Sequence, residues 1–216
     1  MTQRPRTEHR WPVLVTVLVA FAVYAMLPDP LVRLPSWLVT VVGVLALLPL
    51  VLYNPTRLDR ESAWSRRLSI LFAVGFVVVS QVHIVAIVVQ LVDGSADGPT
   101  TLLVAFAVWL TNVVAFGLVF WELDRGGPVA RRVEGIRDDA GQDFRFPQQD
   151  GSPGMDPAWQ PVFFDYLFFS LSSMMAFSPT DVMPLTLRAK ALMAFESLTG
   201  FVLLALVISR GVNILG

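Results

Sequence analysis

The chain has 216 residues, of which 55% are hydrophobic and 15% are charged, with a formal net charge of -1. This composition excludes an ordinary soluble domain and predicts a polytopic membrane protein whose first partner is the lipid bilayer. The lack of cysteine excludes disulfides and thiolate sites, and the near-neutral charge indicates no nucleic-acid partner.

Four apolar stretches follow one another within residues 1–122, at 11–27, 37–53, 68–92 and 100–121. Crossing about 30 Å of hydrocarbon takes roughly 20 residues. The first two stretches are near the short limit, and the third and fourth are long enough. Aromatic residues stand at several of their ends, which is typical of the aromatic belt at a membrane surface. We therefore predict a four-helix transmembrane region in this part of the chain.

The arginines predict the orientation of these spans. They gather in the N-terminal segment, in the loop after the second stretch and in the loop after the fourth, whereas the opposite loops hold Arg33 alone. Because cytoplasmic loops carry an excess of basic residues, the N-terminus is predicted to be cytoplasmic. The arginines on the predicted cytoplasmic side are Arg4, Arg6, Arg10, Arg57, Arg60, Arg66, Arg67, Arg125, Arg131, Arg132, Arg137 and Arg145.

Residues 123–160 are the one long polar stretch, with seven acidic residues and five arginines. Apolar residues recur at helical spacing near 128–138, which predicts a short helix at the membrane surface. The remainder of the stretch is rich in glycine and proline and is predicted to be irregular. We expect this loop to be cytoplasmic.

The last part of the chain, 161–216, predicts a helix, a polar break and a second helix that starts near Leu187. The apolar run 159–177 is just long enough to cross, but Asp165 lies in its first third, where an acid is costly. This run is therefore either a full span or a re-entrant half-helix, and its length favours the full span. A full span would place the break outside the cell, and a re-entrant helix would not.

The break contains Ser178, Pro179, Thr180 and Asp181. Hydroxyl and carboxylate oxygens, together with backbone carbonyls freed by the proline, are groups that hold hard cations. The same residues are also consistent with a capped turn before the next helix, near Pro184. The two interpretations are compatible, because pore loops are themselves capped turns.

Polar side chains also occur inside the predicted spans. Gln81, His83 and Gln90 lie in the third span and Asn112 in the fourth. Intramembrane polar groups are functional candidates by default, and a histidine titrates near neutral pH and can relay protons. The alternative is hydrogen bonding between helices, with Asn112 as the partner of His83.

Glu196 lies about one third into the last predicted helix and must face protein or water, not lipid. It could line a pore, carry protons or pair with a cation. Asp165 is expected to form hydrogen bonds at the interface or between helices. Gly200 is a candidate gating hinge, and its alternative role is close helix packing.

The chain resembles an uncharacterised group of bacterial multi-pass membrane proteins with a C-terminal AFSPTD segment. The likeness covers roughly the second half of the chain. The residues that carry it are Trp121–Pro128 (WELDRGGP), Phe144–Pro147 (FRFP), Phe164–Ser170 (FDYLFFS), Ala176–Pro184 (AFSPTDVMP) and Arg188–Lys190 (RAK). The resemblance implies a location in the bacterial cytoplasmic (inner) membrane.

The same C-terminal segment resembles, in part, the pore helix and inner helix of two-helix potassium channels. In spacing, Asp181 matches the aspartate that ends the TVGYGD motif of those channels, and Pro184 matches the proline that follows it. The filter itself does not match, because Ser178 and Thr180 replace its glycines, whose backbone freedom the filter uses. The predicted topology also differs, since this segment is entered from the cytoplasm, as in glutamate-receptor pores, unless 159–177 crosses fully.

No phosphate-binding loop, zinc-protease motif or nucleophile elbow occurs, so we predict no catalytic residue, cofactor or metal centre.

The expected fold is an all-α membrane bundle of about six apolar helices. The leading functional hypothesis is a homo-oligomeric pore-loop conduit for small ions, tetrameric if it is channel-like. The alternatives are a proton-coupled transporter or sensor that uses His83, Glu196 and Asp165, and a non-conducting scaffold.

Overall fold

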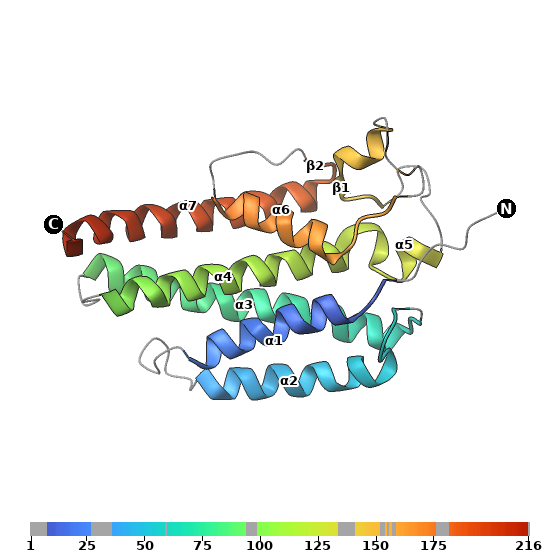
Figure 1. Cartoon of the computed structure of the whole chain (residues 1–216), viewed down its shortest axis with the longest axis horizontal. Helices are drawn as coiled ribbons and strands as arrows, with labels where there is room; N and C mark the ends of the chain where they lie inside the picture. The colour runs from blue at the N-terminus through green and yellow to red at the C-terminus, as the bar shows by residue number, and fades with distance from the viewer. Residues whose placement is uncertain are drawn as a thin grey trace.

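The computed structural model describes residues 8–26, 36–58, 60–93, 99–133, 141–151, 154, 156, 159–175 and 182–215. These residues form a bundle of helices that lie roughly along one axis, with a two-stranded sheet at one end (Figure 1). The elements are α1 (Trp11–Ala25), α2 (Ser36–Tyr53), α3 (Ala63–Asp93), α4 (Pro99–Leu123), η2 (Asp124–Gly126), α5 (Ala130–Val133), β1 (Phe144–Arg145), η3 (Pro147–Asp150), α6 (Phe163–Met175), β2 (Met183–Pro184) and α7 (Leu187–Leu215).

Three of the described helices are long and apolar enough to cross a membrane: Ala63–Asp93, Thr100–Gly126 and Leu187–Val212. Two shorter apolar helices, Trp11–Ala25 and Thr40–Tyr53, accompany them. The predicted helical bundle with membrane-spanning segments is therefore confirmed in this coarser form. Within the short helix expected near 128–138, the structure describes α5 over Ala130–Val133, and residues 134–138 lie outside the described residues. The two-stranded β1–β2 sheet was not expected from the sequence.

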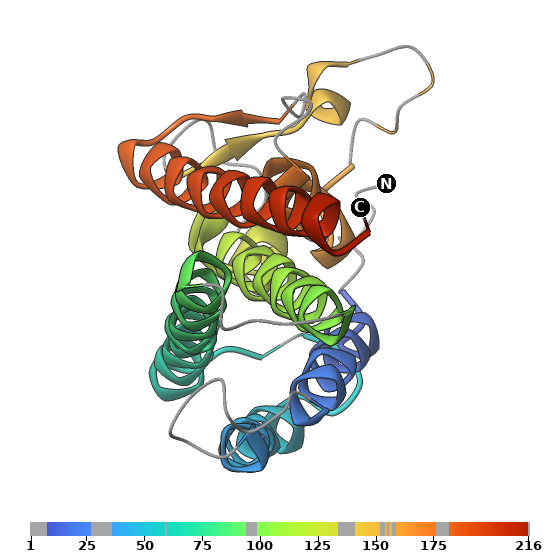
Figure 2. The same ribbon diagram turned by 90° about the vertical axis from the view of Figure 1, so that its left-hand side faces the viewer.

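Helix α4 is the centre of the bundle. It contacts α1 and α3 on one side and α6 and α7 on the other, as the end-on view in Figure 2 shows. Every residue from Thr111 to Glu122 is buried. A helix that is apolar all round is expected to be enclosed by its neighbours, and this one is.

The outer helices keep large apolar side chains on their outward surfaces. Soluble monomers rarely expose contiguous apolar patches of this kind, whereas a lipid-facing or subunit-facing surface requires them. The most exposed examples on the longer helices include Leu71, Val92, Leu103, Leu187, Leu198 and Val212.

Helices α6 and α7 begin at the same end of the bundle. Tyr166, in the first turn of α6, donates a hydrogen bond to Asp124 at the end of α4. Strand β2, directly before α7, pairs antiparallel with β1, with Phe144 opposite Pro184. We call this end, at which α1, α3, α6 and α7 begin and α2 and α4 end, the loop end (Figure 1).

Helix α6 ends about halfway along α7. Its C-terminal turn packs against Gly200, where an added Cβ would lie 2.6 Å from the carbonyl oxygen of Met174. Gly200 is thirteen residues beyond Leu187, which is about 20 Å at 1.5 Å per residue, and α7 has 29 residues. The described part of this run, α6, has 13 residues and runs in the same direction as α7. The length-based expectation that 159–177 crosses fully stays a prediction.

Candidate functional site

The predicted break, Ser178 to Asp181, lies outside the described residues. The structure does describe what flanks it. Met175 ends α6 at mid-length of the bundle, and Val182 is buried in the main core cluster directly before β2. The candidate site is therefore built from the side chains that hold α6 and α7 around this break.

Small residues bring α6 close to both of its neighbours. At Gly117 of α4 an added Cβ would lie 3.2 Å from the Cα of Leu167. The hydroxyl of Ser170 donates to the carbonyl oxygen of Val113 at 2.8 Å, and Ser173 is buried on the same helix face. The serine face of α6 is thus its packing face toward α4 and α7, as small residues at this spacing allow.

Glu196 of α7 is fully buried and hydrogen-bonds with Ser170 through Oε1, while Oε2 has no partner. Ser170 has a single hydroxyl hydrogen, which its bond to Val113 already uses. A protonated Glu196 that donates to Ser170 satisfies both contacts. Neutral burial also avoids the cost of an unpaired carboxylate in an apolar core.

A second polar cluster lies beside the end of α6. The Oδ1 atom of Asn112 accepts hydrogen bonds from Ser80 at 3.0 Å and from Gln81 at 2.7 Å. Its Nδ2 atom donates to the sulfur of Met174 at 3.2 Å. The structure therefore brings together Gln81 and Asn112, two of the polar residues predicted from the sequence, and connects α3 and α4 to the last turn of α6.

His83 has a different partner from the one that the sequence predicted. The Oη atom of Tyr24 lies 2.7 Å from its Nε2, and its Nδ1 lies 3.0 Å from the carbonyl oxygen of Val79. Asn112 is not its partner, because the asparagine faces Gln81. Hydrogen bonding between α1 and α3 accounts for this histidine, and Gln90, two turns further along, is half-buried.

Asp165 and Gly200 have local structural roles. The Oδ2 atom of Asp165 accepts from the backbone N–H of Val162 at 2.7 Å, which closes the first turn of α6 at the loop end. The contact of Gly200 with Met174 is the close packing that was the alternative to a hinge.

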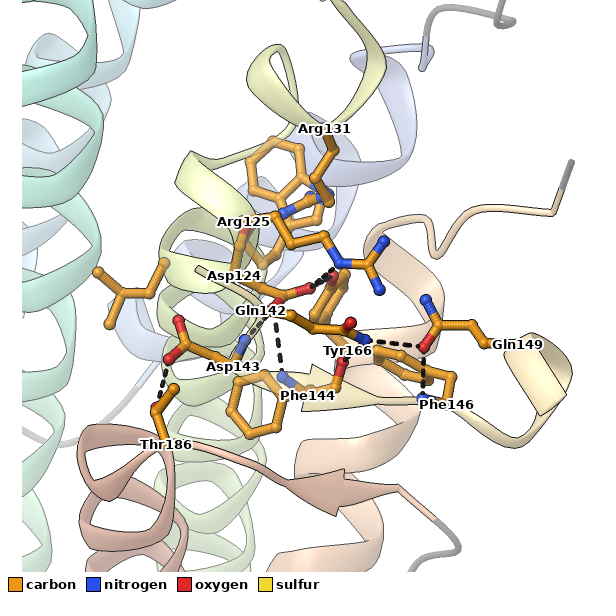
Figure 3. Close-up of polar contacts among 12 residues, drawn as sticks. Asp124, Arg125, Arg131, Gln142, Asp143, Phe144, Phe146, Gln149, Tyr166 and Thr186 are labelled. Carbon is orange, nitrogen blue, oxygen red and sulfur yellow. Dashed lines mark hydrogen bonds and ion pairs between the residues drawn. The ribbon is translucent and has the colours of Figure 1, made fainter. Parts of the chain in front are cut away.

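The sequence did not predict a buried charged network at the loop end (Figure 3). Asp124 is fully buried and accepts three hydrogen bonds: from the backbone N–H groups of Asp143 at 2.7 Å and Phe144 at 3.2 Å, and from the hydroxyl of Tyr166 at 2.5 Å. One carboxylate therefore joins the end of α4 to β1 and α6.

Asp143 extends this network to α7. Its carboxylate accepts from Thr186 and from the guanidinium of Arg188, with Nε at 2.8 Å. Its backbone carbonyl oxygen accepts from Leu185 at 2.8 Å. The start of α7 is thereby attached to the same loop that holds α6.

Arg131 completes the loop-end network. It is buried, donates through Nη1 to the carbonyl oxygens of Trp121 and Asp124 at 2.7 Å each, and lies 5.0 Å above the Tyr166 ring. A desolvated cation over an aromatic ring is attractive, so Arg131 holds Tyr166 in place.

The local sequence contains one signal of this network. The chain turns sharply after α4, with positive φ at Arg125, Gly126 and Gly127. Glycine tolerates such backbone angles, so two glycines directly after a span indicate a tight turn. The hydrogen-bond partners of the Asp124 and Asp143 carboxylates are 19 to 45 residues away in the chain, however, and their meeting depends on the fold.

Among the described residues, no group of three or more His, Cys, Asp or Glu side chains is arranged to hold a metal ion. Comparison with known family models, curated proteins and solved structures finds no match for this chain.

Proposed function

We propose that this chain is one subunit of a homo-oligomeric, pore-loop-type ion conduit in the bacterial cytoplasmic membrane, with α6 as a re-entrant half-helix. The observation that carries the proposal is that α6 and α7 begin at the same end and α6 stops about halfway along α7. Non-helical backbone at membrane depth is tolerated only where protein buries it or water reaches it. The break at Ser178 to Asp181 is the segment to which this rule applies.

The arginine distribution predicts that the loop end is cytoplasmic, and the proposed pore loop would then be entered from the cytoplasm. This is the orientation of glutamate-receptor pores and the inverse of that in potassium channels. The C-terminal end of α6 then lies within the membrane, and the partial negative charge at a helix C-terminus favours cations. Ser178, Thr180 and Asp181 would line the constriction, and selectivity is left open because the filter glycines are absent.

Glu196 has a supporting role in this proposal. It contacts Ser170 in the interior of the bundle, so it supports α6 from behind and does not line the pore. Proton-coupled transport through Glu196 is the second candidate function, favoured by the unpartnered Oε2 atom in the protein interior. The third hypothesis, a non-conducting scaffold, predicts no ion flux at all.

A conduit of this kind requires several subunits, because one half-helix and one span cannot enclose a pore. The exposed apolar side chains of α7, which include Phe195, Leu198 and Phe201, supply a surface for subunits or lipid. We expect a tetramer in native mass spectrometry of the purified protein. A protein that remains monomeric in nanodiscs would contradict the conduit proposal.

Accessibility of an introduced cysteine tests the re-entrant geometry directly, because the natural chain has no cysteine. We expect Asp181→Cys to react with a membrane-impermeant thiol reagent applied from the cytoplasmic side of oriented vesicles. Arg145→Cys, exposed at the loop end, is the matched control for that side. Labelling of Asp181→Cys from the outer side alone would mean that 159–177 crosses fully.

Flux measurements test conduction itself. In proteoliposomes with a cation gradient, Asp181→Asn and Thr180→Val should lower cation flux strongly, whereas Glu196→Gln should leave it nearly unchanged. If Glu196→Gln abolishes a pH-dependent flux and the break variants do not, the proton-coupled hypothesis replaces the conduit.

A further inference from the structure

A cavity of about 70 Å³ lies at the loop end between the start of α1, the end of α2 and the first turns of α3. One water molecule needs about 10–15 Å³ of such space, so the cavity has room for several small polar groups. Its polar lining includes three arginines, Arg10, Arg60 and Arg66, and two glutamates, Glu61 and Glu122. The cavity therefore carries one net positive charge.

Two of these arginines, Arg10 and Arg60, are not neutralised by an ion pair within the part of the chain that the structure describes and can attract an anion. Arg66 is neutralised by Glu122 at 2.5 Å and Glu61 at 3.7 Å. Arg10 instead donates to backbone carbonyls at the end of α2, including Asn54 at 3.1 Å. Among the described residues no ion pair joins Arg10 or Arg60 to a carboxylate.

The cavity also holds an unsatisfied buried acceptor. Asn54 is 6% exposed, and its Nδ2 donates to the carbonyl oxygen of Arg60 at 2.8 Å, which assigns Oδ1 as the free acceptor. That Oδ1 atom has no hydrogen-bond partner. Buried acceptors are nearly always paired, so this one calls for a donor such as a hydroxyl group.

An apolar groove adjoins the cavity. It has a volume of about 420 Å³, lies between α2 and α3 against α1, and shares Phe72 with the cavity. Its lining includes Val42, Ala46 and Gly75. The open space between α2 and α3 therefore begins at a cationic, hydroxyl-accepting site and continues along an apolar path.

We propose that this composite site binds one anionic phospholipid whose headgroup carries a hydroxyl, as phosphatidylglycerol does. The phosphate would face Arg10 and Arg60, the headgroup hydroxyl would donate to Asn54, and an acyl chain would lie in the groove. Basic pockets between helices on the cytoplasmic side are known recognition sites for anionic lipids. Trp64 is exposed at the same end of the bundle, and its ring packs edge-on against Tyr53 with 5.2 Å between the ring centroids. Tryptophan and tyrosine are enriched at membrane–water interfaces, so this pair indicates that the cavity lies at the level of the lipid headgroups.

This site lies on the α1–α2–α3 side of the bundle and does not depend on the proposed conduit. Native mass spectrometry of the full chain, released from nanodiscs of phosphatidylglycerol and phosphatidylcholine in equal amounts, measures the lipid retained. We expect one phosphatidylglycerol per chain and no phosphatidylcholine. Equal retention of both lipids would overturn the proposal.

Charge variants test the headgroup site. Arg10→Gln and Arg60→Gln should each weaken phosphatidylglycerol retention about fivefold. Arg67→Gln is the matched control, because Arg67 is exposed near the start of α3 at the same end of the bundle and does not line the cavity. A loss in Arg67→Gln equal to that in the other two would mean general surface attraction.

Filling the groove tests the acyl-chain site without removing charge. A Cβ built on Gly75 meets no atom within 4 Å, so Gly75→Phe can occupy the groove in a folded protein. Gly211→Phe is the control, with equally open surroundings on α7. Gly75→Phe should lose the retained lipid and Gly211→Phe should keep it; unchanged retention in Gly75→Phe would overturn the proposal.

A soluble headgroup separates a lipid site from a free-phosphate site. Glycerol 3-phosphate in a neutral detergent should raise the thermal midpoint much less than phosphatidylglycerol does. If both raise it equally, the site binds a phosphate anion alone and the lipid proposal fails.

Discussion

The two sides of α4 are built differently. On one side, α6 packs closely against Gly117 of α4 and Gly200 of α7, and the starts of α6 and α7 are attached at the loop end by the buried Asp124 and Asp143 network. On the other side, α1, α2 and α3 leave a cationic cavity and an apolar groove between them. The comparison indicates that the chain specifies the position of α6 tightly and leaves space where a lipid can supply the missing contacts.

The largest effect should come from breaking the loop-end network. Asp124→Leu would leave two buried N–H groups and the Tyr166 hydroxyl without an acceptor. We expect a loss of about 3–5 kcal/mol in the free energy of unfolding, measured by denaturant titration in mixed micelles. A loss below about 1 kcal/mol would mean that the network does not hold α6 in place.

Two glycine substitutions should have opposite signs on the two sides of α4. Gly200→Ala places a Cβ 2.6 Å from the Met174 carbonyl oxygen and should cost about 1–3 kcal/mol. Gly75→Ala meets open space and should stabilise by up to about 1 kcal/mol through helix propensity. The same unfolding titration compares the pair, and equal signs would contradict the packing difference between the two sides.

The state of Glu196 can be tested by two conservative changes. Ser170→Ala removes the hydrogen-bond partner of a buried carboxyl group and should cost about 1–3 kcal/mol. Glu196→Gln keeps a donor toward Ser170, so it should change stability by less than about 1 kcal/mol if the acid is protonated. A gain of several kcal/mol in Glu196→Gln would instead indicate that a charged carboxylate is buried there.

The smallest effect should come from the exposed ion pair between Arg145 and Asp150, in the loop that also contains Asp143. Arg145 lies 2.5 Å from Asp150, but both side chains are about half exposed. Arg145→Gln should therefore cost less than about 1 kcal/mol, with the difference reduced further at high salt. A cost similar to that of Asp124→Leu would show that burial does not distinguish these two parts of the loop.

Part of the candidate site was predictable from the sequence. The polar candidates Gln81, Asn112 and Glu196 were recognised because polar groups in apolar helices stand out in composition. The partners of such polar residues could not be predicted, because they lie on other helices: His83 bonds to Tyr24, and Glu196 bonds to Ser170. The seven-residue spacing of His83 and Gln90 shows that they share a helix face, but it does not show which helix packs against that face.

The sequence by itself determined the helical membrane character of the chain, the apolar segments that became α3, α4 and α7, and the arginine-rich end. These features depend on local hydrophobicity and charge, which each segment carries wherever it packs. Only the tertiary structure decided that α6 runs in the same direction as α7, because an apolar run of 19 residues fits both a span and a half-helix. Asp124 and Asp143 join the starts of α6 and α7 at the same end through Tyr166 and Arg188, and residues so distant in the chain meet only when the bundle has folded.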